Sequence, residues 1–171
     1  AGEVTAPRLD LSNEDLIRAH IHATWLAWTG LSLTEGQGSI LEVIDAEQET
    51  LALQQAVQDQ IAFTPAKRQG CLLECQRILA ACGPDVADAD WRQEGWLEAQ
   101  IDGAASAFDR AFDRWREIYR AAMTQLMAAQ MQQVSGFRKA GKASAEAIKD
   151  AEAAMREARR QLELLTCQNV R

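Results

Sequence analysis

Two stretches near the C-terminal end decide the fold: residues 108–129, FDRAFDRWREIYRAAMTQLMAA, and residues 148–165, IKDAEAAMREARRQLELL. In each stretch, apolar side chains recur at alternating steps of three and four residues, which places them on one face of a helix. Between them lies SGFRKAGKAS, residues 135–144, where Ser144 is suited to cap a helix. The sequence therefore predicts a long antiparallel helical hairpin. The predicted seam residues are Phe108, Phe112, Trp115, Tyr119, Ala122, Leu126 and Ala129, and Ile148, Ala151, Met155, Ala158, Leu162 and Leu165.

Helical patterns also fill the first half of the chain. We predict helices over residues 15–29, 39–45, 48–63 and 65–82, with an acidic loop at 84–92. Gly30 ends the first helix, and Thr64 and Pro65 form a typical helix start. The predicted fold class is all-α, with residues 1–171 as a single domain. Residues 12–90 form a small bundle, 91–134 and 144–166 form the arms of the hairpin, and 135–143 form its tip.

The first predicted helix, residues 15–29, carries apolar side chains around most of its circumference. Only Asp15, Arg18 and His22 mark a polar strip, so we expect this helix to be buried nearly all round. His20 lies among apolar neighbours and is interpreted as a buried, hydrogen-bonded core histidine.

Charge is unevenly distributed along the chain. The net charge is −7, yet residues 1–90 carry five Lys/Arg against 14 Asp/Glu, whereas residues 135–171 carry eight against five. An acidic body with a basic end argues against nucleic acid wrapping the whole molecule. Every apolar run is shorter than the roughly 20 residues of a membrane span. Residues 1–10 also lack a signal-peptide pattern, so we expect no membrane partner and a cytoplasmic location.

Residues that would support catalysis or metal binding are not arranged in a known pattern. Cys71, Cys75, Cys82 and Cys167 are expected to be free thiols, because their spacing matches neither a disulfide framework nor a zinc site. The sequence contains no phosphate-binding loop of the G-x-x-x-x-G-K-[ST] type. The turn Gly36-Gln37-Gly38 does not supply one. We therefore predict no catalytic residue, no metal and no cofactor in this chain.

The tip of the predicted hairpin holds the candidate functional residues. Phe137, Arg138, Lys139 and Lys142 place three cations and an aromatic ring at a glycine-flanked bend. One hypothesis is that they contact a phosphate backbone or act as a small wedge against a strand end. The alternative is that the cations only solubilise a loop and that Phe137 folds back onto the hairpin. The aromatic residues at 108–119 are interpreted as seam residues rather than as a base-stacking platform.

Several segments resemble a known family. They are PRLDL at 7–11, NEDL at 13–16, RAHIHATWLA at 18–27, SILEVID at 39–45, WL at 96–97 and FDRAFDRWREIYR at 108–120. Over about residues 6–165 the chain resembles the helical region that follows the second ATPase lobe of large DEAD/DEAH-box helicases of bacterial phage defence, namely the DISARM helicase subunit and its relatives. The acidic body departs from what a primary DNA-binding surface would show.

The resemblance implies a non-catalytic accessory domain. ATP and Mg would be bound only by the parent helicase, and the implied partners are its motor lobes, DNA and other subunits of a defence complex. We therefore expect a domain that braces the motor and contacts nucleic acid through the basic tip. The alternative is a protein–protein docking module without direct nucleic-acid binding.

Overall fold

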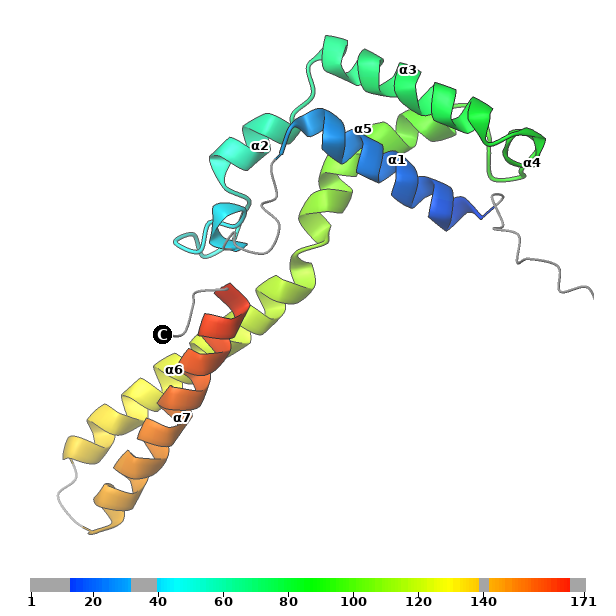
Figure 1. Ribbon diagram of the computed structural model, residues 1–171. Helices are drawn as coiled ribbons and strands as arrows, with labels where there is room; N and C mark the ends of the chain where they lie inside the picture. The colour runs from blue at the N-terminus through cyan, green and yellow to red at the C-terminus, as the bar shows by residue number, and fades with distance from the viewer. Residues whose placement is uncertain (1–12, 32–39, 139–141, 167–171) are drawn as a thin grey trace, which may run out of the picture. The chain divides into compact units, whose positions relative to one another are not determined.

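The computed structural model describes residues 13–31, 40–138 and 142–166, without the side chains of residues 85, 136–138 and 142–144. These residues are predominantly helical and contain no β-strand beyond an isolated antiparallel bridge between Ile44 and Leu53. The predicted all-α class is confirmed. The helices are α1 (Glu14–Thr29), the short 3-10 helix η1 (Ile40–Glu42), α2 (Gln55–Ile61), α3 (Pro65–Ala81), α4 (Pro84–Ala87), α5 (Trp96–Arg110), α6 (Asp113–Arg138) and α7 (Lys142–Thr166), as Figure 1 shows.

The chain forms two compact units, which differ from the predicted division into a bundle and a hairpin. Unit 1 comprises residues 1–32 and 55–108, and unit 2 comprises residues 33–54 and 109–171. Residues 40–54, predicted in the N-terminal bundle, therefore belong with the hairpin. The predicted turn at 36–38 and Cys167 lie outside the described residues.

In unit 1, helix α1 is buried along one stripe rather than all round. Ile17, Ile21 and Trp25 are at most 5% exposed, whereas His20 and the alanines on the same side of α1 are exposed. The prediction of a core His20 is therefore wrong. An exposed alanine side chain costs little free energy, because its apolar surface is small. The alanine-rich face can therefore remain in water, whereas the large side chains of Ile17, Ile21 and Trp25 are stabilised by burial.

Unit 1 is organised around the indole of Trp25. Its ring centroid lies 5.8 Å from that of Phe63 and 6.1 Å from that of Phe108. Helix α3 begins as predicted, because the Thr64 side chain accepts a hydrogen bond from the Lys67 backbone amide and Pro65 stands at the first helical position. The buried α3 residues are Cys71, Leu72, Cys75 and Leu79.

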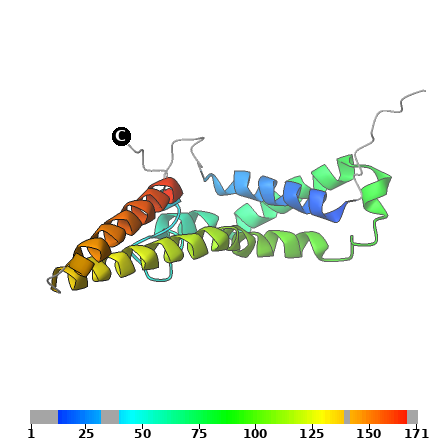
Figure 2. The same ribbon diagram turned by 90° about the horizontal axis from the view of Figure 1, so that it is seen from below.

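In unit 2, α6 and α7 lie side by side as an antiparallel hairpin, which Figures 1 and 2 show from two directions. Alanines line the seam as predicted: Ala122 and Ala129 of α6 and Ala151 and Ala158 of α7 are at most 3% exposed. Small seam residues allow two helices to approach closely. At the open end of the hairpin, the Trp115 indole N–H donates to the Leu165 carbonyl at 2.8 Å and its ring stacks on Tyr119.

Residues 40–54 are held against α6 by a buried arginine. Arg116 is 7% exposed, and its Nε donates to the carbonyl of Leu51 at 2.9 Å. Leu51 adopts a φ of 52°, a left-handed conformation that leucine rarely takes. This residue lies inside the helix predicted for 48–63, which is wrong in its first half: the segment turns at 46–50 and α2 starts only at Gln55.

The first predicted arm, residues 91–134, is not one helix. Helix α5 ends at Arg110 and α6 begins at Asp113. The same Arg116 accounts for the interruption, because it donates to the Asp109 carbonyl and to the Asp113 carboxylate, both at 2.8 Å. The seam therefore starts at Trp115, while Phe108 packs in unit 1. The second arm begins at Lys142, two residues before the predicted cap Ser144.

Candidate functional site

The predicted tip residues stand where the two hairpin helices end. Phe137 and Arg138 are the last residues of α6, and Lys142 is the first residue of α7. Lys139 lies outside the described residues, as do the side chains of the other three. The helix ends thus bring this part of the predicted site to one end of the hairpin, and the contacts of the four side chains remain a prediction.

Three cations form a line along the outer face of α7, from Lys149 to Arg160. Ala151 and Ala158 mark the face of α7 that is buried against α6. Lys149, Arg156 and Arg160 are exposed, and their steps of seven and four residues place them together on the opposite side of the helix. With a rise of 1.5 Å per residue, these steps space the three side chains by about 10 and about 6 Å.

Acidic residues flank this line but do not interrupt it. Glu152 is partly exposed, and Glu146, Asp150, Glu157 and Glu163 are exposed. Their positions on the helix place them to either side of the basic line. The basic side chains therefore form a narrow line. Such a line can attract a linear array of negative charges more readily than it can attract a broad acidic surface.

Helix α6 carries a second surface feature, which was not predicted from the sequence. A groove of about 560 Å³ lies between α6 and the turn at 46–49. Met123 and Met127 lie on its α6 side, and Glu47 and Glu49, both exposed, lie on the other. The turn is held by Asp45, whose carboxylate accepts hydrogen bonds from the Glu47 amide and the Gln48 side chain.

Beyond the groove, α6 exposes a ridge of large apolar side chains. Met127 is 56% exposed, Met131 75% and Val134 56%, and their spacing of four and three residues puts them on one face. A sequence signal could have found this ridge: residues 121–135, AAMTQLMAAQMQQVS, contain no charged residue. A solvated helix face ordinarily carries charged side chains.

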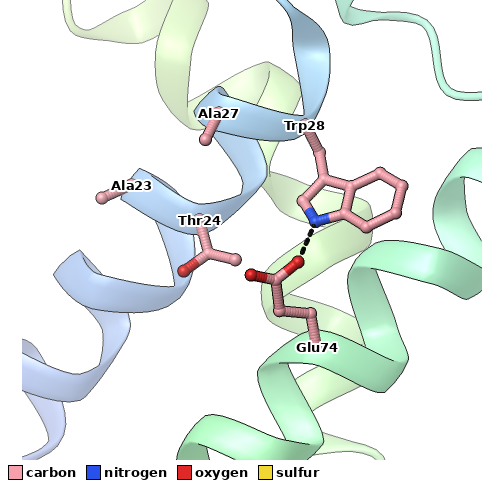
Figure 3. A pocket seen from close by; sticks show the side chains of 5 residues that line it. All are labelled: Ala23, Thr24, Ala27, Trp28 and Glu74. Atoms are coloured by element: carbon pink, nitrogen blue, oxygen red, sulfur yellow. Dashed lines mark hydrogen bonds between the residues drawn. The ribbon is translucent and has the colours of Figure 1, made fainter.

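A shallower pocket of about 510 Å³ lies in unit 1 between α1 and α3 (Figure 3). It is lined by Ala23, Thr24, Ala27, Trp28 and Glu74. The Trp28 indole N–H donates to the Glu74 carboxylate at 2.7 Å, so the indole N–H already has its partner within the pocket lining. This closed pairing favours a packing role over ligand binding.

Gly70 lets the Trp28 ring lie on α3. A Cβ at Gly70 would come within 2.5 Å of the ring, whereas a Cβ at Gly103 of α5 would meet nothing within 4 Å. We expect Gly103→Ala to raise the free energy of unfolding by about 0.5–1 kcal/mol through helix propensity. Gly70→Ala should lower the free energy of unfolding by about 1 kcal/mol, because the clash of the new Cβ with the Trp28 ring outweighs the gain in helix propensity. Urea denaturation compares the two, and equal stabilisation by both would contradict the packing role of Gly70.

Cys71 and Cys75 of α3 and the partly buried His22 of α1 show features of packed residues. Burial raises the pKa of the Cys71 thiol and raises that of Cys75 to about 12, so both remain protonated near neutral pH. Burial lowers the pKa of His22, with Arg18 acting in the same direction. Among residues 13–31, 40–138 and 142–166, no three His, Cys, Asp or Glu side chains are placed to hold a metal ion.

Comparisons with protein-family models, curated proteins and solved structures find no match for this chain. Within the described part of the chain, no helix combines the length and the apolar character needed to cross a membrane.

Proposed function

We propose that this chain is a non-catalytic accessory module of an ATP-dependent DNA helicase, and that its hairpin contacts the phosphate backbone through the tip and the outer face of α7. The observation that carries the nucleic-acid contact is the line of exposed Lys149, Arg156 and Arg160 opposite the buried alanines of α7. The helicase setting is supported by the sequence resemblance alone. In that setting the parent protein binds ATP and Mg.

The contact follows from simple electrostatics. Each Lys or Arg that neutralises a phosphate releases condensed counterions, which favours binding and makes it sensitive to salt. Phosphates repeat every 3.4 Å or so along each strand. Flexible side chains spaced by about 6–10 Å along a helix can therefore reach phosphates of one strand. No base would be read by such a surface, so we expect little sequence preference.

The acidic remainder of the chain would restrict the orientation of this contact. With a net charge of −7 on the whole chain, nucleic acid should be repelled from most of the surface and admitted only at the basic face. An accessory module needs no more than a weak, oriented contact when a motor supplies the main affinity.

The second candidate function is a protein–protein docking module that binds the motor lobes or another subunit of a defence complex and has no direct contact with nucleic acid. The exposed ridge of Met127, Met131 and Val134 favours it, because exposed apolar patches mark interaction surfaces.

Fluorescence anisotropy with a labelled single strand and a labelled duplex tests the proposal. One variant carries Lys149→Gln, Arg156→Gln and Arg160→Gln, and a second carries Arg138→Gln, Lys139→Gln and Lys142→Gln. We expect each to weaken binding by about tenfold or more at low salt, since each removes up to three phosphate contacts.

The control carries Arg77→Gln, Arg110→Gln and Arg114→Gln, which change the net charge equally at exposed sites on helices other than α7. It should bind nearly as well as the unchanged chain. If the control weakens binding as much as the α7 variant, the effect is one of net charge and the α7 contact is wrong. If the unchanged chain does not bind either probe, the docking function is favoured instead.

A further inference from the structure

We infer that the groove and ridge of α6 form a binding site for a basic amphipathic helix of a partner protein. This surface lies on α6 and on residues 46–51, whereas the proposed phosphate contact lies on α7 and at the tip. The inference therefore stands independently of the nucleic-acid proposal.

The first observation is the shape and apolar character of the surface. Met123, Met127, Met131 and Val134 follow one another at steps of four, four and three residues. They span about 16 Å along α6, three turns of helix. A partner helix presents its own apolar anchors at the same steps, so it can lie along such a ridge over a similar length. Methionine suits this task, because its unbranched, polarizable side chain adapts to different apolar partners.

The second observation is the charge at the rim of the groove. Glu47 and Glu49 are exposed on the turn that faces Met123 and Met127. The cation on the opposite wall is Arg120, whose guanidinium donates to the Thr50 carbonyl at 2.9 Å. The rim is therefore net negative, and it should favour a helix that carries Lys or Arg beside its apolar stripe.

The third observation is that the turn is held in place before any partner binds. Asp45 accepts two hydrogen bonds from the turn, and Arg116 and Arg120 bind the carbonyls of Leu51 and Thr50 from α6. A preorganised rim lowers the entropic cost of association, because its carboxylates need little ordering on binding.

Anisotropy with labelled synthetic peptides tests this site in the full chain. The probe is a helical peptide of about 16 residues, long enough to cover three turns of α6, with leucines at steps of three and four and lysines flanking them. A second peptide replaces each lysine by glutamate, and a third replaces each leucine by glutamine. We expect the lysine peptide to bind, with each of the other two at least about tenfold weaker.

Two variants of the chain assign the binding to the groove and ridge. Met127→Gln with Met131→Gln should weaken binding of the lysine peptide by about tenfold or more, because the apolar anchors of the peptide lose their contacts. Glu47→Lys with Glu49→Lys should invert the preference, so that the glutamate peptide binds better than the lysine peptide. The control is Leu164→Gln with Leu73→Gln, two comparably exposed apolar residues, 66% and 45%, on other helices, and it should bind as the unchanged chain does.

Three outcomes would overturn the inference. The first is equal binding of the lysine and glutamate peptides, which would mean that the acidic rim is not used. The second is undiminished binding by the Met127 and Met131 variant. The third is that sedimentation equilibrium shows a dimer of the unchanged chain. This dimer would have to be dissociated by the Met127 and Met131 variant alone and not by the peptide, which would mean that a second copy of the chain covers the ridge. Substitution of the ridge should leave nucleic-acid binding unchanged, which separates this test from that of the proposed function.

Discussion

Trp25→Ala is expected to lower the free energy of unfolding by about 3–5 kcal/mol, as large aromatic truncations in cores do. The Trp25 side chain is 3% exposed and packs between the rings of Phe63 and Phe108. Its removal deletes apolar contacts and leaves a cavity that two rigid rings fill poorly. The midpoint of urea denaturation, followed by far-ultraviolet circular dichroism, measures the loss.

Trp25→Phe serves as the graded control, because it keeps an aromatic ring in the same position. Its expected cost is below about 2 kcal/mol. It also keeps the prediction testable if Trp25→Ala does not fold. A cost below about 1 kcal/mol for Trp25→Ala would mean that the Trp25 cluster is not the core of unit 1.

Arg116→Met should lower the free energy of unfolding by about 2–4 kcal/mol, because several charge-assisted hydrogen bonds are lost at once. This is the second largest effect that we expect. The substitution keeps the buried aliphatic stem but leaves the Leu51 carbonyl without its 2.9 Å donor. The Asp109 and Asp113 side chains are 48% and 57% exposed, so water can replace the arginine there. Most of the loss in the free energy of unfolding should therefore come from the buried Leu51 carbonyl, which is left without its donor.

Arg114→Met is the matched control on the same helix. The Arg114 side chain is 80% exposed and pairs with the exposed Glu117 at 3.3 Å, so its loss should cost less than about 0.5 kcal/mol. Hydrogen exchange of the amides at 43–54 should rise in Arg116→Met and remain unchanged in Arg114→Met. Equal stability of the two variants would contradict the role of Arg116 in holding this segment.

Elements governed by local signals could be predicted from the sequence. Helix α3 starts where Thr64 and Pro65 indicate, since both act on the first turn alone. The α6–α7 seam follows from the spacing of its alanines, because that periodicity defines one buried face whatever the rest of the chain does.

Elements governed by distant contacts could not be predicted. The segment at 46–51 is held by Arg116, which lies 65 residues from Leu51 and binds its carbonyl. No local pattern marks an arginine as buried, and charged residues are rarely buried without partners that only the fold supplies. The first half of the predicted helix 48–63 failed for this reason.

The candidate sites divide in the same way. The cations of the tip and of α7 are visible in the sequence, and the exposed position of Lys149, Arg156 and Arg160 follows once Ala151 and Ala158 define the seam. The α6 groove was missed because it requires the turn at 46–49 to lie beside Met123 and Met127, a contact between segments far apart in the chain.

The salt dependence of single-strand binding tests the central claim most directly. The slope of log K against log salt counts the phosphates neutralised, at about 0.7 per contact for a single strand. We predict that Lys149→Gln, Arg156→Gln and Arg160→Gln, made singly, each lower the magnitude of this slope by about that amount, while Arg77→Gln leaves it unchanged. Slopes that are the same for all four variants and for the unchanged chain would contradict a phosphate contact on α7.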